Sequence, residues 1–420
     1  MGFGPEGTGR RVLSIHSGAW RRLAVALAVL VAAGAILCWW LGGQIGMDSG
    51  VYRGGALALL HGDPLYGILR FSPKTSLGLP FTYPPVAGLL FLPLAALPPQ
   101  LVWGVFAVLT VLGLVLVLRA SVTASGKVWL VPVLGLGVLL LEPVWRGLGL
   151  GQINVVLMAL VVLDVLVLPR SRYGGVLAGL AAAIKLTPLI FVLHLLVTGR
   201  RADAARASGT FLGLNAVSLL LLPQDTLAFW RTQLLGGNNA TGASYGRNQS
   251  LNGLIQRLTG HPGSAFTIAV LAGLVCLAIA LPLARRLHQR GETLGALLVT
   301  AFCGLLVSPV SWTHHWVWLV PLAGLLVTRA VRAPKVATML PIVGLATLCT
   351  GICTMPPAGG NAEAHWNIAQ QVLGNGYVLA ALAVGAIVAV RVFFGRPSIP
   401  DKRPSVQISR ASGIPATVRG

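Results

Sequence analysis

The chain has 420 residues, of which 55% are apolar and 10% are charged, and its mean hydropathy is +0.80. A soluble globular protein carries about 25% charged residues, and a disordered chain is poor in apolar ones, so both classes are excluded. The 31 Lys and Arg residues exceed the 10 Asp and Glu residues and give a net charge of +21. Such an excess is typical of nucleic-acid-binding proteins, or of membrane proteins with basic cytoplasmic connections.

Apolar runs long enough to cross a bilayer, about 20 residues each, recur along the chain. The first run, 20–42, is too long for a signal peptide and lacks a small-residue cleavage site, so we interpret it as a transmembrane helix. The basic residues lie between the runs, which favours a polytopic membrane protein and argues against a nucleic-acid partner. Further runs, with shorter candidates at 84–97 and 208–222, lie at 100–119, 128–144, 151–168, 174–198, 264–284, 295–310, 314–329, 335–354 and 376–394.

The pattern predicts an all-α membrane domain at 20–395 with about eleven or twelve crossings. It is preceded by a basic cytoplasmic N-terminus at 1–19 and followed by a disordered cytoplasmic tail at 396–420. We expect the protein to be a multi-pass protein of the plasma membrane.

The basic connections orient the C-terminal half of the chain. If the runs alternate, four basic groups fall on one side, which should be cytoplasmic. These groups are Arg200, Arg201 and Arg206; Arg285, Arg286 and Arg290; Arg329, Arg332 and Lys335; and Arg391, Arg396, Lys402 and Arg403. The first outer loop is then 43–83, and a long outer loop is 224–262.

The middle of the chain allows two models. Simple alternation places Arg119, Lys127, Arg170 and Arg172 outside, against the charge rule. The second model splits 174–198 into half-helices meeting near Lys185-Leu-Thr-Pro188 and makes 84–97 a non-crossing dip, because proline and its preceding residue favour a break. It places these four bases inside and Gly151-Gln-Ile-Asn154 outside, and we prefer it.

The ten acids are few enough to consider by position. Asp164 is expected to be buried and hydrogen-bonded, Asp203 to be a solvated partner of arginines, and Asp225 to be a helix N-cap. Asp48 follows the first transmembrane run within a few residues, at the bilayer boundary. Partial desolvation there raises the pKa of a carboxyl and makes it a better proton acceptor near neutral pH, whereas a helix cap or an ion pair with Arg53 is the structural alternative.

Other polar groups gather on the predicted outer face. His314 and His315 lie between tryptophans and are candidates for a phosphate contact or a proton shuttle; adjacent histidines point apart on a helix, so a metal site is disfavoured. Tyr83 is a candidate sugar platform. Polar residues at membrane depth mark pathways or sites, which adds Lys185, with snorkelling as its alternative, and Gln152 with Asn154. Asn248 and Gln249 are candidates because they belong to a polar stretch in the longest loop between runs.

The order of these segments resembles family 87 of the glycosyltransferases, membrane enzymes of the GT-C class. The resemblance runs from about Asp48 to Trp318 and rests on order and spacing. The segments are Asp48-Ser-Gly-Val-Tyr52-Arg53, His61-Gly-Asp-Pro-Leu-Tyr66, Phe81-Thr-Tyr-Pro-Pro85, Gly151-Gln-Ile-Asn154, Ile184-Lys-Leu-Thr-Pro188, Asn248-Gln-Ser250 and Ser308-Pro-Val-Ser-Trp-Thr-His-His-Trp316.

The resemblance implies a GT-C fold and an inverting transfer of mannose from polyprenyl-phospho-mannose to a glycolipid acceptor, with an α-(1→2) product, on the outer face of the membrane. It implies Asp48 as the catalytic base, which accepts the proton of the acceptor hydroxyl. Phosphatidylinositol mannoside and lipomannan are the acceptors considered, and no metal or other cofactor is implied.

The implied donor-phosphate contacts are His314, His315, Lys185 and Arg53. The implied substrate contacts are Tyr52, Tyr83, Gln152, Asn154, Asn248 and Gln249. Three alternatives remain open: transfer of another sugar such as arabinofuranose or glucose, a lipid or solute transporter, and a non-enzymatic subunit with the same fold. A transporter would favour inverted repeats and midplane charges, and neither is evident.

Overall fold

The computed structural model describes residues 46–67, 69, 79–123, 127–169, 171–234, 242–260, 262–332, 341–342, 344–345 and 350–395. Within these ranges the chain is helical, without strands, and Asn248 and Trp312 form an isolated antiparallel bridge. The predicted first crossing at 20–42 and the two predicted tails, 1–19 and 396–420, lie outside the described residues.

The helices of the first half are α3 (Met47–His61), α4 (Pro85–Phe91), η1 (Leu92–Ala96), α5 (Pro99–Thr123), α6 (Leu130–Val138), α7 (Glu142–Leu150), α8 (Asn154–Val162), η2 (Leu163–Val167), α9 (Val176–Ile184), η3 (Thr187–Leu189) and α10 (Ile190–Val197). Those of the second half are α11 (Arg201–Leu221), α12 (Pro223–Ala228), η4 (Phe229–Leu234), α13 (Leu251–Thr259), α14 (Pro262–Gln289), α15 (Thr293–Val307), η5 (Thr313–Trp318), α16 (Leu319–Arg332), η6 (Ile352–Thr354), η7 (Ala362–His365), α18 (Ile368–Gly374) and α19 (Gly376–Phe393).

Four helices in the described part of the chain are long and apolar enough to cross a membrane, and α6 with α7 forms a fifth candidate that is bent by 69°. The four are Pro99–Thr123, Arg201–Leu221, Gly263–Gln289 and Gly376–Phe393. Shorter apolar helices lie between them, so the chain is a multi-pass membrane protein and the predicted all-α class is confirmed. The total of eleven or twelve crossings stays a prediction, because 20–42 and most of 335–354 are outside the described residues.

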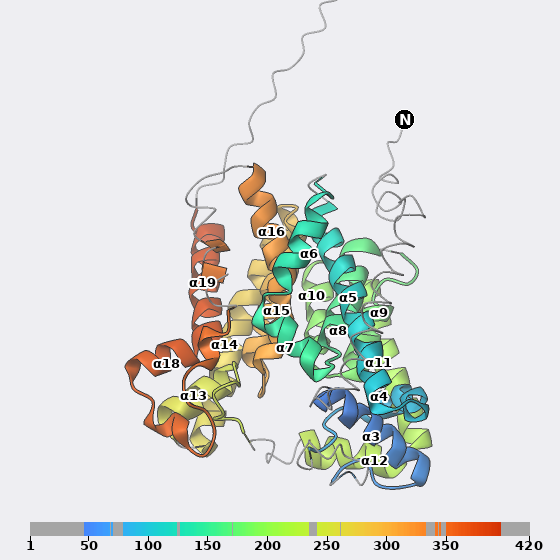
Figure 1. The fold of residues 1–420 in the computed structure, drawn as a ribbon. Helices are drawn as coiled ribbons and strands as arrows, with labels where there is room; N and C mark the ends of the chain where they lie inside the picture. The colour runs from blue at the N-terminus through green and yellow to red at the C-terminus, as the bar shows by residue number, and fades with distance from the viewer. Residues whose placement is uncertain are drawn as a thin grey trace, which may run out of the picture.

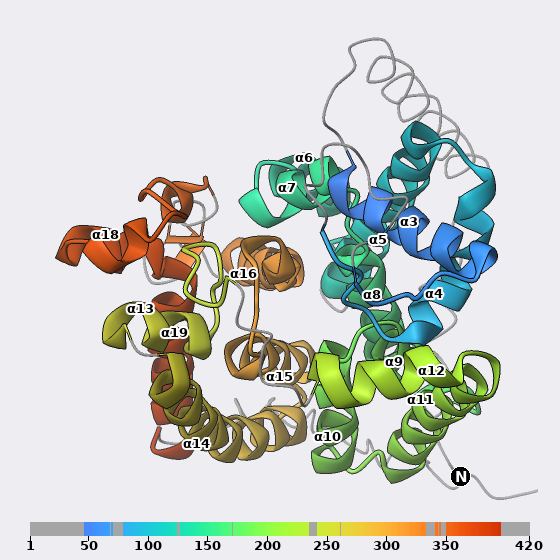
Figure 2. The ribbon, with the colours of Figure 1, turned by 90° about the horizontal axis from the view of Figure 1, so that it is seen from below.

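The short helices gather at one end of the bundle (Figure 1), where α3, α4, α12, α13 and α18 lie below the longer helices. Seen from that end (Figure 2), α3, α4 and α12 cover one side, and α13 and α18 lie on the other. The two predicted outer loops, 43–83 and 224–262, therefore share an end of the molecule.

Basic side chains of the C-terminal half gather where the ends of α14, α16 and α19 meet the start of α15. Arg290 donates to the carbonyl of Val392 at 2.8 Å, and Arg286 lies over the Phe393 ring at 4.3 Å. Arg329 pairs with Glu292 at 2.6 Å. Three of the predicted basic connections are therefore on the same side, as alternation requires, while the assignment of that side to the cytoplasm stays a prediction.

The predicted break inside 174–198 is present. Helix α9 ends at Ile184, Lys185 is extended at φ −148° and ψ 134°, and η3 and α10 follow. Pro188 has no N–H to donate to the preceding turn, which favours the interruption. The 12 residues from Pro85 to Ala96 form an apolar helix, which at 1.5 Å per residue reaches about 18 Å and is too short to cross the hydrocarbon core.

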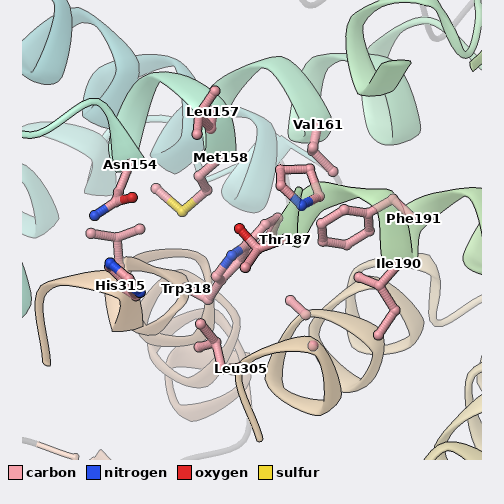
Figure 3. A pocket seen from close by; sticks show the side chains of 14 residues that line it. Asn154, Leu157, Met158, Val161, Thr187, Ile190, Phe191, Leu305, His315 and Trp318 are labelled. Carbon is pink, nitrogen blue, oxygen red and sulfur yellow. The ribbon is translucent and has the colours of Figure 1, made fainter. Parts of the chain in front are cut away.

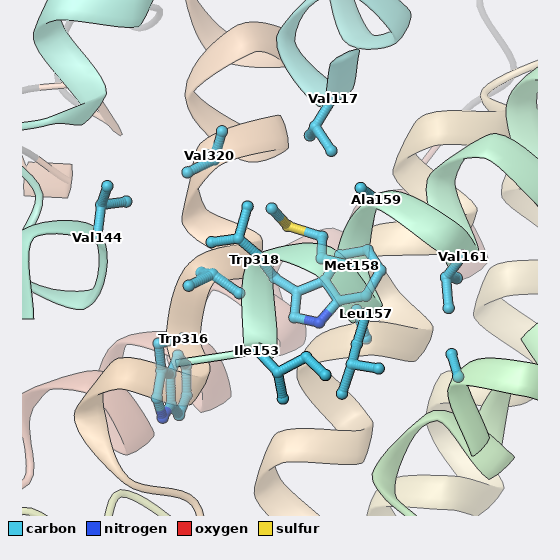
Figure 4. Close-up of a cluster of buried hydrophobic side chains, with 14 of the residues drawn as sticks. Val117, Val144, Ile153, Leu157, Met158, Ala159, Val161, Trp316, Trp318 and Val320 are labelled. Carbon is cyan, nitrogen blue, oxygen red and sulfur yellow. The ribbon is translucent and has the colours of Figure 1, made fainter. Parts of the chain in front are cut away.

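Apolar side chains of α7, α8 and η5 contribute to one buried core (Figure 4). Ile153, Met158 and Trp316 are among its buried members, and Trp316 stacks on Tyr377 with ring centroids 5.3 Å apart. The core holds the first turn of α8 against η5. It therefore fixes the relative positions of the two segments that carry Asn154 and the histidine pair.

Two buried acids organise the junction of α9 and α11. The carboxylate of Asp164 accepts hydrogen bonds from the backbone N–H groups of Gly175 at 2.5 Å and Ala178 at 2.9 Å, so the expected buried, hydrogen-bonded acid is confirmed. The expected solvated role of Asp203 is wrong, because Asp203 is 3% exposed and pairs with Arg200 and Arg206. At Gly175, φ is +96° and a Cβ would lie 1.9 Å from the Asp203 carbonyl, so α9 and α11 approach too closely to admit water.

The expected N-cap role of Asp225 is also wrong. Helix α12 begins at Pro223 with Leu222 at the N-cap position, and its N-cap makes no side-chain hydrogen bond. Asp225 Oδ1 instead accepts from the backbone N–H of Leu65 at 2.9 Å. The acid therefore joins α12 to the turn after α3, a partner 160 residues away that no local pattern indicates.

Replacing Asp164 by alanine should destabilise the protein by about 2–5 kcal/mol, because it leaves the buried N–H groups of Gly175 and Ala178 without their acceptor, at about 1–3 kcal/mol each. Glu292→Ala, which breaks the exposed pair with Arg329, should cost under about 1 kcal/mol. Denaturation of the purified variants in detergent measures both changes. Equal losses for the two variants would contradict the assigned role of Asp164.

Candidate active site

The start of α3 is fastened to the end of α7. Gly46, in the left-handed region at φ 82°, donates its N–H to the Gly149 carbonyl at 2.9 Å, and Ser49 donates its hydroxyl to the Gly46 carbonyl at 3.0 Å. Asp48 lies in the first turn of α3 and is half-buried. Its carboxylate therefore faces the segment that follows α7.

That segment is Gly151-Gln152, which ends α7. Gly151 has φ +68°, and a Cβ on it would lie 2.5 Å from the Ser49 hydroxyl, so glycine is required for the close approach. Gln152 Nε2 donates to Asp48 Oδ2. Gln152 Oε1 accepts from the Tyr52 hydroxyl at 3.1 Å, and the Tyr52 and Tyr83 hydroxyls are 2.9 Å apart. A continuous hydrogen-bonded chain thus runs from Asp48 to Tyr83.

Aromatic rings enclose this chain. Tyr52 is 1% exposed; its ring meets the Tyr83 ring edge-on at 5.2 Å and stacks on Phe91 at 4.8 Å. Tyr66 donates its hydroxyl to the Tyr83 carbonyl at 2.7 Å, just before Pro84 and Pro85 begin α4. The hydroxyls of Tyr52 and Tyr83 are therefore held in one arrangement by packing.

A cationic group lies on the other side of Tyr83. Lys185 Nζ donates to Asn154 Oδ1 at 3.0 Å, lies 3.2 Å from His315 Nε2, and is 5.3 Å from the centroid of the Tyr83 ring. Asn154 Nδ2 donates to the His314 carbonyl at 3.1 Å. The break before η3 thus delivers Lys185 to the first turn of α8 and to η5.

The electrostatics of Asp48 match those of a proton acceptor. Burial raises the pKa of its carboxyl above the ordinary value, while the Gln152 hydrogen bond and the charges of Lys185 and Arg146 oppose that rise. The pKa of Tyr52 is raised well above its ordinary value, mainly by burial and also by Tyr83 and by the negative charge of Asp48. Tyr52 is therefore neutral and holds Gln152 rather than titrating.

An apolar groove opens beside the cationic group (Figure 3). Asn154 and His315 lie at one end of the groove, and α8, α10 and α15 form its walls. The walls carry Met158, Phe191 and Leu305. A polar end beside apolar walls suits a ligand that has a charged head next to a hydrocarbon tail.

The sequence pattern of glycosyltransferase family 87 matches residues 81–309, which is more than half of the chain. This chain belongs to glycosyltransferase family 87. The polyprenol-phosphate-mannose-dependent alpha-(1-2)-phosphatidylinositol mannoside mannosyltransferase of Mycobacterium tuberculosis H37Rv is 33% identical over 408 residues, covering 91% of this chain and 94% of the relative. The polyprenol-phosphate-mannose-dependent alpha-(1-2)-phosphatidylinositol pentamannoside mannosyltransferase of Mycobacterium tuberculosis CDC 1551 is 38% identical over 315 residues. The match covers 72% of this chain and 71% of that relative.

A similarity to a solved structure is more distant. The crystal structure of ArnT from Cupriavidus metallidurans bound to undecaprenyl phosphate matches with a TM-score of 0.44 and 15% sequence identity. The match covers 91% of this chain and 79% of the ArnT chain. A TM-score this low carries no argument about the site. The resemblance to family 87 noted in the sequence is confirmed by the family match and by the mycobacterial relatives.

The glycosyltransferase brings together eight of the predicted site residues: Asp48, Tyr52, Tyr83, Gln152, Asn154, Lys185, His314 and His315. Arg53 is not among them, because its Nε donates to the Leu97 carbonyl at 2.6 Å and holds the end of η1. The role of Arg53 as a phosphate contact stays a prediction without support from these contacts.

Asn248 and Gln249 are also directed elsewhere. Asn248 Nδ2 donates to the carbonyls of Ala243 at 2.9 Å and Pro309 at 3.3 Å. Gln249 Nε2 donates to the carbonyls of Gly246 at 2.9 Å and Gly374 at 2.6 Å. Both side chains hold the outer loop against neighbouring segments of the glycosyltransferase, and their substrate contacts stay predictions.

Sequence reasoning missed Glu142 and Arg146. Glu142 is 0% exposed, and its two oxygens accept from the Thr313 hydroxyl at 2.8 Å and from the Tyr377 hydroxyl at 3.2 Å. Arg146 Nε lies 3.8 Å from Glu142 Oε1. The only sequence signal was their spacing of four on one helix face, which is typical of an exposed pair as well.

The described residues contain no group of three or more His, Cys, Asp or Glu side chains that could hold a metal ion.

Gly151→Ala should lower turnover about 10- to 100-fold, because strain at positive φ and the contact with Ser49 displace Gln152 from Asp48. The matched control is Gly149→Ala on the same turn, where a Cβ meets nothing within 4 Å, and it should keep near-normal turnover. Transfer assays in membranes with equal protein levels measure both. Equal turnover of the two variants would show that the close approach does not position the site.

Proposed function

We propose that this glycosyltransferase transfers mannose from polyprenyl-phospho-mannose to a lipid-linked mannoside with an α-(1→2) linkage. The observation that carries the proposal is the arrangement around Tyr83. Its hydroxyl is linked through Tyr52 and Gln152 to a half-buried carboxylate, Asp48. Lys185, which contacts His315 at one end of the apolar groove, lies over the Tyr83 ring. A base, a phosphate contact and a path for a prenyl chain are the parts that such a transfer needs.

In the proposed reaction, Asp48 accepts the proton of the acceptor hydroxyl as that oxygen attacks the anomeric carbon of the donor. The new glycosidic bond forms while the bond to the phosphate oxygen breaks, and polyprenyl phosphate leaves with the bonding electron pair. A single displacement inverts a β-linked donor into an α-linked product. Gln152 holds the carboxylate toward the site, since its other end is fixed by Tyr52.

Lys185 and His315 are proposed to stabilise the charge on the leaving phosphate. Nζ of Lys185 contacts Asn154 at 3.0 Å and His315 at 3.2 Å, and neither partner carries a negative charge, so the ammonium group is available to an anion. The prenyl chain would then enter the groove that starts at Asn154 and His315. Each buried methylene adds about 0.8 kcal/mol to such binding.

The acceptor and the location are supported by the relatives and by the arrangement of the helices. The mycobacterial relatives are named for phosphatidylinositol mannosides, which makes a phosphatidylinositol-linked mannoside the proposed acceptor. The site lies at the end of the bundle that carries α3 and α12, away from the basic connections (Figure 1). By the charge rule that end faces the periplasmic side of the plasma membrane.

Asp48→Asn should lower turnover with polyprenyl-phospho-mannose by about 10²–10⁴-fold, because the amide cannot accept the proton. In the wild type, kcat/KM should rise with pH through the raised pKa of Asp48 and then level, since only the ionised carboxylate is the base. Asp48→Glu should keep part of the activity. Radiolabel transfer across a pH series measures these effects.

The same assay includes wild-type protein with polyprenyl-phosphate donors of mannose, glucose and arabinofuranose, followed by linkage analysis of the product. The proposal requires the mannose donor to be the best and the product to be α-(1→2)-linked. Normal turnover of Asp48→Asn would remove Asp48 as the base, and a better non-mannose donor would overturn the donor assignment.

Gly304→Leu should raise the KM for a decaprenyl donor by about tenfold, because its side chain would meet Ile190 and fill space worth about two methylenes. The loss should be smaller for a donor with one isoprene unit. Gly213→Leu on α11, where a Cβ meets nothing within 4 Å, is the matched control. Equal losses with both donors would show that the groove does not hold the chain.

A further inference from the structure

A second group of polar side chains meets at η5. Glu142 accepts from the Thr313 hydroxyl at 2.8 Å, and Arg146 Nε lies 3.8 Å from the same carboxylate. The backbone N–H of Thr313 donates to the carbonyl of Arg247 at 3.1 Å. Helix α7, the outer loop and η5 therefore bring Arg146 and Arg247 to the residue that precedes His314.

His314 is buried among these charges without a hydrogen bond to its ring. It is 8% exposed, and neither ring nitrogen has a hydrogen-bond partner in the described part of the chain. The positive charges of Lys185, Arg146 and Arg247 all act on it. A buried polar group without a partner costs about 1–3 kcal/mol, so the ring is placed for a ligand rather than for the fold.

Arg247 also has a buried side-chain nitrogen without a hydrogen bond. Its Nε is buried and has no hydrogen-bond partner within the described residues. Arg146 and Arg247 also repel each other. Glu142 only partly offsets these charges, because a single carboxylate faces two guanidinium groups. The group keeps a positive excess and free donors.

A nearby arginine shows what a purely structural guanidinium looks like in this protein. Arg257 is 5% exposed, and its nitrogens donate to the carbonyls of Ser244, Tyr245 and Asn248 and to the Asn375 side chain. Every nitrogen of Arg257 has a partner. Arg247 differs from Arg257, because its Nε has no hydrogen-bond partner in the described part of the chain.

We propose that Arg146, Arg247 and His314 form a binding site for a phosphate oxyanion next to the Lys185–His315 pair, because the ring centroids of His314 and His315 are 4.8 Å apart. Arginine presents a planar fork of donors that matches phosphate geometry, and His314 supplies a further ring nitrogen. This inference rests on the proposed function, since a substrate supplies the phosphate. Two substrate groups share the chemistry: the phosphate of the prenyl donor and the phosphodiester of a phosphoinositide acceptor.

The test uses Arg247→Gln and Arg247→Lys. The hydrogen bond from Thr313 is accepted by the backbone carbonyl of Arg247, so both substitutions keep this contact between the loop and η5. Loss of a charge-assisted hydrogen bond to phosphate should raise one KM at least about tenfold, with a smaller fall in kcat. Arg247→Lys should recover part of the affinity. Arg231→Gln, which removes an exposed arginine from the same predicted outer loop, 224–262, is the matched control and should behave as wild type.

Two arms identify the source of the phosphate. A raised donor KM together with weaker inhibition by farnesyl phosphate assigns the site to the prenyl phosphate. A raised KM for a phosphatidylinositol-mannoside acceptor, with an unchanged KM for octyl α-mannoside, assigns it to the acceptor phosphodiester. If neither KM changes relative to Arg231→Gln, the phosphate site does not exist.

Protection of the protein against thermal denaturation, by farnesyl phosphate and separately by phosphatidylinositol, gives a readout that does not depend on transfer. Wild-type protein without turnover on polyprenyl-phospho-mannose would overturn the proposed function. Protection by either lipid that is lost in Arg247→Gln would then still support the phosphate site, and protection by neither in the wild type would overturn it. A variant with a melting temperature far below that of Arg231→Gln would show that Arg247 is structural, which also overturns the inference.

Discussion

The contact between the start of α3 and the end of α7 determines the geometry of the site. The Gly46–Gly149 hydrogen bond and the close approach of Gly151 to Ser49 leave no room for adjustment, so Gln152 must meet Asp48. A carboxylate on a short outer helix would otherwise sample several rotamers. Here one amide side chain spans the distance to Tyr52, and packing of the aromatic rings fixes its far end. A displacement of about 1 Å can cost a reaction about 10²-fold in rate, so this restraint matters for the proposed role of Asp48 as the base.

Buried acids serve the fold in this protein by satisfying backbone and hydroxyl groups at helix ends. Asp164 accepts the N–H groups at the start of α9, Glu363 accepts those of Gly246 and Gly359, and Glu142 ties η5 to α19 through Thr313 and Tyr377. Water is scarce at these positions, so each unsatisfied group would be costly. At His314, by contrast, both ring nitrogens are buried without a hydrogen-bond partner in the described part of the chain, and the ring lies beside the candidate site.

Much of the fold was predictable because its signals are local. The all-α class follows from long apolar runs, and the break at Lys185 follows from Pro188. The positions of Asp203 and Asp225 were not predictable, since their burial and their partners depend on the packing of α9 on α11 and on the turn after α3. Asn248 and Gln249 look like site residues in the sequence. In the structure, however, the Asn248 amide donates to the carbonyl of Pro309 and the Gln249 amide donates to that of Gly374, so both side chains fasten their loop to other segments.

The sequence by itself determined that this is a helical membrane protein of family 87, and it named eight side chains that the structure brings together. Composition and motif order suffice for that, because hydrophobicity and chain breaks act over a few residues. Only the tertiary structure decided which polar groups face one another. Arg146 and Arg247 lie 101 positions apart in the chain, and long-range contacts bring both to η5. Arg146 lies beside Glu142, which binds the Thr313 hydroxyl 171 positions away, and the carbonyl of Arg247 accepts from the Thr313 N–H.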